Sequence, residues 1–219
     1  MDFSGPDLSD FANVRALNHA WLLRWREARA GAPLRRELPP SIGSLVDGLT
    51  NLQVERLATA PFLLFSVRER DERCWRELDA PDPNLDLLSG PDHGNDELRT
   101  SAVSFLWQLA CRNPYAVRLV SGATLGWCER LAAATLLDVL RVAAGIDDVL
   151  QPRFARNEDF WRKLLGPGLS SDTPTRYSAH ITCLQWLLTD NPQAGYRRIR
   201  AAACANALPT SSVAEKPYP

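Results

Sequence analysis

The residues that could do chemistry are few and far apart in this chain of 219 residues. The three histidines, His19, His93 and His180, have no nucleophile at the spacing of a catalytic motif. Neither a glycine-rich phosphate loop nor a pair of carboxylates on one helix face occurs. His93 lies between Asp92 and Gly94, but a metal site there would need further ligands. We therefore expect a protein that is not an enzyme, with no catalytic residues, cofactor, metal or small-molecule substrate.

The cysteines also fail to form a recognisable site. They are five in number, they are scattered, and none is part of a C-x-x-C pair. An odd, dispersed set argues against both a disulfide framework and a structural zinc site. We expect buried, reduced thiols at Cys74, Cys111, Cys128, Cys183 and Cys204.

Positive charge is almost all arginine, and two clusters of it stand out, at residues 24–36 and 197–200. The net charge of -1 gives no overall attraction to nucleic acid or to membranes. Glu27 and Glu37 lie among the first group of arginines, so a solvated helix face is the alternative to phosphate binding. If the protein contacts DNA or an acidic partner, the predicted contacts are Arg24, Arg35, Arg36, Arg197, Arg198 and Arg200.

Two tryptophans, Trp75 and Trp161, occupy matching places in the similar segments 72–78 and 158–164, when an insertion of about a dozen residues is allowed in the second copy of the internal repeat. Exposed aromatic side chains at the ends of helical units are candidate anchors for a protein partner. Packing in the core is the alternative for each. A stripe of aromatic and apolar residues from Phe11 to Ala28 has helical spacing, and it fits either a core face or a stacking platform for a ligand.

These residues must be positioned by helices, because the sequence predicts an all-α fold with an internal repeat. Residues 45–67 overlay residues 119–141 at an offset of 74 with ten identities in 23 positions. The predicted unit is a long helix, an Asn-Pro turn, a short helix-turn-helix and a Trp-Arg helix. About two and a half copies follow one another: residues 1–80, 97–166 and a partial unit at 176–208. Residues 209–219 show no periodicity and are predicted to be a disordered tail.

Local signals give the helix boundaries within this unit. Thr50 with Gln53 fits a capping box, and Pro114 after Asn113 fits the first turn of a helix. Gly122 suits a tight helix end. The two short helices that follow look like a helix-turn-helix, and we expect Leu136, Leu140 and Ala143 or Ala144 to face inward on the second. That second helix offers almost no polar side chains to base edges, so we interpret it as a packing element.

At residues 105–145 the chain resembles FlhD, the helical subunit of the bacterial FlhD-FlhC flagellar transcriptional activator. The shared features are a long apolar helix, Gly122 before a short helix, the run Leu131-Ala132-Ala-x-Thr135-Leu136, and a Leu/Val-rich helix that ends in alanine. Residues 45–67 carry a weaker version of the same features. The resemblance implies an all-helical dimerising scaffold that acts in transcription with a zinc-containing, DNA-binding partner. This chain is about twice as long and carries the unit in tandem, so the two units could form within one chain the packing of a dimer.

Two functions therefore remain open. The first is a transcriptional regulator or co-regulator of FlhD type that binds DNA weakly or through a partner protein. The second is a helical adaptor or structural component of another bacterial assembly, such as a secretion or mobile-element system, with no DNA-related role. No leader segment and no run of about 18 apolar residues is present, so we expect a cytoplasmic protein without membrane contact.

Overall fold

A computed structural model describes residues 5–28, 38–78 and 97–189. Most of these residues are helical, which confirms the predicted helical class, and the described part also contains one ribbon of two very short strands. The elements in chain order are α1 (Leu8–Glu27), α3 (Pro40–Asp47), α4 (Asn51–Ala58), β1 (Phe65–Ser66), η1 (Arg76–Leu78), α5 (Glu97–Arg112), α6 (Pro114–Ser121), α7 (Leu125–Ala133), α8 (Leu136–Gly145), β2 (Gln151–Pro152), α9 (Glu158–Leu165), η2 (Pro167–Leu169) and α10 (Thr173–Thr189).

The helices α4 and α6 begin at the capping residues that the sequence predicts. Thr50 and Gln53 form the capping box of α4, and the side chain of Asn113 accepts a hydrogen bond from the backbone at the start of α6. Thr135 caps α8 in the same way. Gly122 ends α6 with φ +67°, a left-handed conformation that glycine adopts without a steric penalty.

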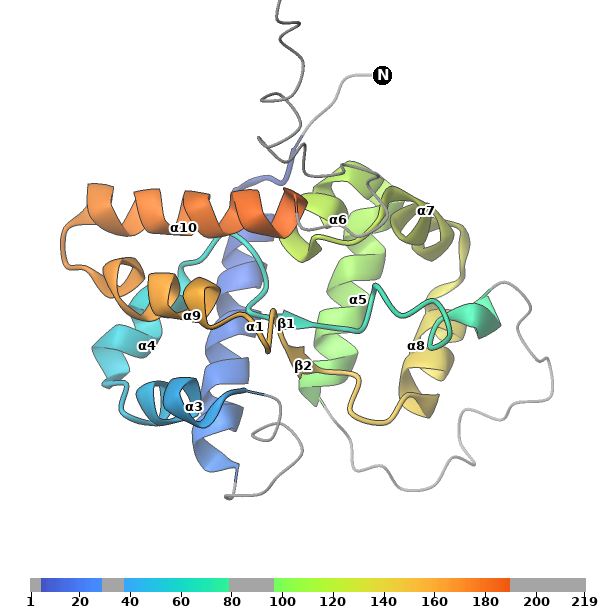
Figure 1. Ribbon diagram of the computed structural model, residues 1–219. Helices are drawn as coiled ribbons and strands as arrows, with labels where there is room; N and C mark the ends of the chain where they lie inside the picture. The colour runs from blue at the N-terminus through green and yellow to red at the C-terminus, as the bar shows by residue number, and fades with distance from the viewer. Residues whose placement is uncertain (1–4, 29–37, 79–96, 190–219) are drawn as a thin grey trace, which may run out of the picture.

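The helices lie on two sides of the β1–β2 ribbon (Figure 1). On one side α1 packs against α3 and α4, and on the other side α5 packs against α6, α7 and α8. The two long helices, α1 and α5, also contact each other. The ribbon is antiparallel, with Phe65 opposite Pro152 and Ser66 opposite Gln151. It therefore joins two halves that come from separate stretches of the chain.

A buried asparagine fixes the segment that leads into β1. Asn18 on α1 is 0% exposed, and its amide donates to the carbonyl oxygen of Phe62 at 2.9 Å. Its side-chain oxygen accepts from the backbone N–H of Leu64 at 2.8 Å. A buried polar side chain is tolerated when its hydrogen bonds are made, so these two bonds tie α1 to the start of the ribbon. The apolar residues 62–65 of this segment are fully buried.

One continuous hydrophobic core includes buried residues from both predicted units. The face of α5 that lies in this core includes Ala102, Phe105, Leu106 and Leu109, which are all buried. Of the inner face predicted for α8, Ala143 is buried and Leu140 is partly buried against the core, whereas Leu136 and Ala144 are not part of the core. That helix is rotated so that its β-branched residues face the core; the buried residues of α8 are Val139, Val142 and Ala143.

At the predicted offset of 74, α3 coincides with α6 and the capped helix α4 coincides with the capped helix α7, but the elements that follow do not repeat. At that offset β1 would coincide with residues 139–140, which lie inside α8. The tryptophan segments differ as well, because Trp161 lies in α9 whereas Trp75 precedes only the 3-10 turn η1. The third predicted unit begins within α10 and continues outside the described residues. The predicted tail also lies outside them.

Candidate interaction surfaces

Of the six arginines predicted to contact DNA or an acidic partner, only Arg24 lies in the described part of the chain. Arg35, Arg36, Arg197, Arg198 and Arg200 lie outside it. Arg24 is exposed in the last turn of α1, where a positive charge is favourable to the helix dipole. It lines a groove between α1 and α5.

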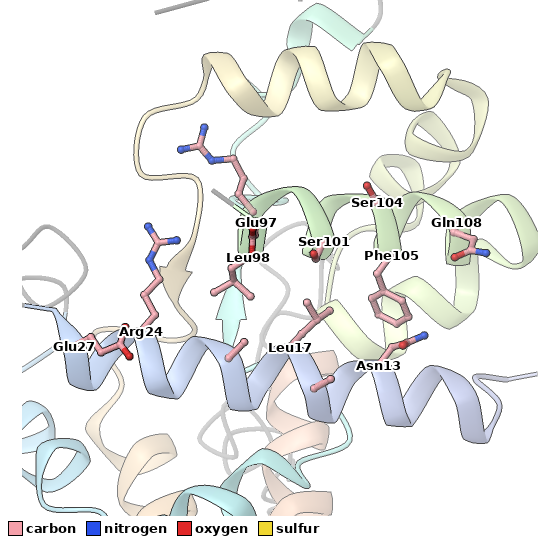
Figure 2. A pocket seen from close by; sticks show the side chains of 13 residues that line it. Asn13, Leu17, Arg24, Glu27, Glu97, Leu98, Ser101, Ser104, Phe105 and Gln108 are labelled. Carbon is pink, nitrogen blue, oxygen red and sulfur yellow. The ribbon is translucent and has the colours of Figure 1, made fainter. Parts of the chain in front are cut away.

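The α1–α5 groove has a volume of about 1060 Å³ and is open to solvent along its length (Figure 2). Figure 2 shows Leu17, Leu98 and Phe105 on its floor, with polar side chains such as Gln108 along the rim. Two arginines, Arg24 and Arg99, are matched by two glutamates, Glu27 and Glu97. A groove with an apolar floor and a polar, charge-balanced rim can bind the apolar face of an amphipathic helix.

The two predicted tryptophan anchors are not on the surface. Trp75 and Trp161 are both 0% exposed, so their prediction as partner anchors is wrong and the alternative, packing in the core, is confirmed. Each indole N–H donates to a backbone carbonyl eight residues earlier: Trp75 to Val67 at 3.2 Å, and Trp161 to Arg153 at 2.9 Å. These bonds satisfy the polar edge of each ring, which allows both rings to pack in the core.

A second surface lies beside the ribbon and is rich in arginine. Two adjoining hollows, of about 660 and 420 Å³, share Ser66, Arg70 and Gln151 in their walls. We refer to both together as the arginine hollow. Six arginines line it against three acidic residues, a local net charge of +3 in a chain whose net charge is -1. The arginines are Arg68, Arg70, Arg73, Arg76, Arg153 and Arg156.

A buried ion pair forms the floor of the arginine hollow. Arg153 and Glu69 approach to 2.8 Å, and their side chains are only 4% and 1% exposed. The guanidinium also donates to the carbonyl oxygens of Leu63 and Phe65, and Ser66 donates to the glutamate. Burial raises the pKa of Glu69, but the charge of Arg153 and these hydrogen bonds outweigh it and hold the pKa below its ordinary value. This group is already neutralised and is not available to a ligand.

Three other arginines of the hollow remain available. Arg73, Arg76 and Arg156 are exposed, and none makes an ion pair with a described residue. Arg68 differs, because it is paired with Asp71 at 2.9 Å. Arg73 and Arg76 line the larger of the two adjoining hollows, and Arg156 lines the smaller one. Planar guanidinium groups bind phosphate and carboxylate through paired N–H bonds, so each hollow offers a contact to an anion such as a phosphate group.

The sequence does carry a signal for this hollow, in a segment outside the two predicted arginine clusters. Segment 68–76 carries four arginines in nine residues. The acidic residues between these arginines make the segment look nearly neutral in the sequence. The structure shows that Glu69 forms an ion pair with Arg153 and that Asp71 forms one with Arg68. Arg156 is distant in sequence and joins the hollow through the β1–β2 pairing.

One described histidine is buried in the core. His180 is 3% exposed, and burial, together with the charge of Arg176, lowers its pKa from 6.5 to about 4. The folded protein therefore holds His180 neutral, while the unfolded chain takes up a proton below about pH 6.5.

We expect this difference to make stability depend on pH. The free energy of unfolding should fall as pH drops from 6.5 towards 4, by up to about 3 kcal/mol from this group. Denaturant unfolding at pH 7 and pH 5 measures the effect. In His180→Leu the loss of stability between pH 7 and pH 5 should shrink, because leucine takes up no proton in the folded or the unfolded state; an unchanged loss would contradict the assignment.

The remaining reactive groups do not assemble into a site within the described residues. Cys128 and Cys183 are buried, as predicted, and burial raises the pKa of both thiols to about 12. Cys111 is exposed and Cys74 is only half-buried, which contradicts the prediction for both residues, and Cys204 lies outside the described part. Residues 5–28, 38–78 and 97–189 contain no group of three or more potential metal ligands. No helix among them has the length and apolar character needed to cross a membrane.

Comparisons with protein-family models, with curated proteins and with solved structures find no match to this chain.

Proposed function

We propose that this chain is a helical interaction protein without catalytic activity, a transcriptional regulator or co-regulator of FlhD type that acts through a partner protein. The segment that resembles FlhD runs through the second half of α5 and the helices α6, α7 and α8, so its features belong to one packed group of helices. Among the described residues, the potentially reactive histidine and thiols in the core are held neutral by burial. Both features favour a scaffold over an enzyme.

The observation that carries the DNA-related part of the proposal is the arginine hollow. Arg73, Arg76 and Arg156 are exposed there without ion-pair partners among the described residues. Contacts between arginine and phosphate supply most of the affinity of non-sequence-specific DNA binding. Three contacts are few, so the chain alone should bind DNA weakly and depend on its partner for sequence recognition.

We also propose that the chain carries its unit in tandem at a spacing of 85 to 86 residues. At 85 residues, the capped helix α4 corresponds to the capped helix α8, with Thr50 matching Thr135. At 86 residues, β1 corresponds to β2, and Trp75 to Trp161. The two non-glycine residues that follow the strands with positive φ, Arg68 at +57° and Phe154 at +48°, also match at 86. This spacing needs only one inserted residue between the helix and the strand.

The α1–α5 groove supports the alternative, an adaptor in another bacterial assembly with no role at DNA. Its balanced charge and apolar floor suit a helix from a protein better than they suit a phosphate backbone.

A pull-down of the tagged chain from its host lysate, with and without nuclease, separates the two functions. The regulator predicts recovery of DNA, or of a DNA-binding protein, that nuclease treatment or the variant R73A/R76A/R156A reduces at least tenfold. The control R15A/R26A/R162A removes the same charge from exposed positions elsewhere and should leave recovery unchanged. Recovery of protein partners that is indifferent to nuclease and to the hollow variant would favour the adaptor.

A further inference from the structure

The ribbon has the register expected of a two-fold axis. At the spacing of 86, Phe65 corresponds to Gln151 and Ser66 to Pro152. The observed pairs are Phe65 with Pro152 and Ser66 with Gln151. Phe65 thus pairs with the residue that corresponds to Ser66, and Ser66 pairs with the residue that corresponds to Phe65. A strand that pairs with a copy of itself about a two-fold axis has this register. The two units therefore meet about an axis that passes through the ribbon.

The segments that follow the two strands cross this axis. After β1, Trp75 packs edge-on against Trp127 of α7 with ring centroids 5.4 Å apart, and η1 packs against α8. After β2, Trp161 stacks on Trp21 of α1 at 6.2 Å, and α9 packs against α3. Each unit is completed by the tryptophan segment of the other (Figure 1).

The buried ion pair breaks the symmetry of this arrangement. At the spacing of 86, Arg153 corresponds to Val67, and Glu69 corresponds to Ala155. One side of the axis therefore carries arginine with glutamate, whereas the corresponding positions on the other side are valine and alanine. A pairing of two first units would bury two Glu69 carboxylates without an arginine, and a pairing of two second units would bury two Arg153 guanidiniums without a carboxylate. Leaving a buried charge unpaired is strongly destabilising.

We propose that the two units of this chain are obligate unlike partners, which exchange their tryptophan segments across the ribbon, and that the Glu69–Arg153 pair specifies the unlike pairing. The partner that fits the ribbon surface of each unit is the other unit of the same chain. This inference rests on the tandem unit proposed above and is independent of DNA binding. A failure in the DNA experiments would leave it intact, and the reverse also holds.

The first test is a double-mutant cycle in the intact chain. Glu69→Gln and Arg153→Met keep side-chain size while removing charge. Each alone should lower the folding equilibrium constant about 100-fold or more, because one charge stays buried without its partner. The double variant should be at least about 100-fold more stable than the product of the two single effects. The same cycle at the exposed pair Glu158 and Arg162, with E158Q and R162M, is the control and should show coupling of a few-fold at most. Additive effects at Glu69 and Arg153 would overturn the assigned role of the pair.

The second test cuts the folded chain at a protease site inserted within residues 79–96, between η1 and α5. Because the tryptophan segments cross, we expect the fragments to stay together as a one-to-one complex by native mass spectrometry. Release of separate fragments would overturn the exchange.

Exchange between cut molecules then tests specificity. Incubated near the unfolding midpoint and returned to native buffer, the wild-type fragments should form unlike pairs at least tenfold in excess of like pairs. In E69Q/R153M that excess should fall towards the statistical ratio. Like pairs in abundance from the wild type, or an excess unchanged in the variant, would contradict the proposal.

Discussion

Trp161→Ala should lower the free energy of unfolding by about 3–5 kcal/mol, the cost typical of emptying a large aromatic site in a core. The ring is 0% exposed and contacts Trp21 and Phe160 at centroid distances of 6.2 and 5.9 Å. Its removal also leaves the carbonyl oxygen of Arg153 without the indole N–H at 2.9 Å. Urea unfolding followed by near-ultraviolet circular dichroism measures the loss.

Two comparisons make the result specific. Leu137→Ala removes an apolar side chain that is 59% exposed and should change stability by no more than about 0.5 kcal/mol. Trp161→Phe keeps most of the packing but loses the hydrogen bond, and it should fall between the wild type and alanine. If Trp161→Ala proved as mild as Leu137→Ala, the ring would lie at the surface, as a partner anchor would, and the segment exchange would fail with it.

Gly122→Ala should destabilise the protein by about 2–4 kcal/mol, the sum of backbone strain and a local clash. Gly122 has φ +67°, and a Cβ built on it would lie 2.6 Å from Cγ of Leu187 in α10. The substitution must therefore push α10 away from the end of α6. Hydrogen exchange should accelerate first in α10, and denaturant unfolding gives the total.

Gly126→Ala is the matched control. Gly126 lies inside α7, and a Cβ added there meets nothing within 4 Å. Alanine is the better helix former, so this change should stabilise the protein by about 0.5–1 kcal/mol. Equal effects at the two glycines would show that α10 does not pack on Gly122.

The helices could be predicted because their signals are local. The capping box of Thr50, the Asn113-Pro114 start and the left-handed end at Gly122 each depend on a few neighbouring residues, and all three are confirmed. Strands of two residues have no period to detect, so β1 and β2 were missed. Their pairing joins residues almost ninety positions apart, a relation that spacing and composition do not express.

The predicted offset of 74 does not hold for the whole unit, because it rests on sequence identity alone and not on the positions of the helices and strands. Helices α4 and α7 both follow a capping threonine and share an Glu-Arg-Leu-Ala run, which favoured the offset of 74. The match at 85 to 86 has fewer identities along its central run. It also aligns two capped helices, α4 and α8, and in addition it aligns the two strands, which the offset of 74 does not. The prediction of the tryptophans as partner anchors failed for a related reason. Each tryptophan segment lies at the end of its own unit and has no partner there that would bury it. It is buried by the other half of the same chain, which the sequence of one unit does not reveal.

In the candidate site, too, local features could be predicted from the sequence, whereas features that depend on tertiary contacts could not. The predicted arginine clusters were selected by local density, and Arg24, their only described member, lies beside Glu27 and Glu97 in a charge-balanced groove. The arginine hollow depends on which carboxylates are already paired. The burial of Glu69 against Arg153 is a tertiary fact that local charge counts do not contain.

The most direct measurement of the central functional claim is the salt dependence of binding to a fluorescent 20-base-pair duplex, followed by anisotropy. Each arginine–phosphate contact adds about 0.9 to the slope of log K against log salt, so the wild type should show a slope steeper by about 2–3 than that of R73A/R76A/R156A. R15A/R26A/R162A should keep the wild-type slope. Equal slopes for the wild type and the hollow variant, or a loss of slope in the control alone, would contradict phosphate binding at the arginine hollow.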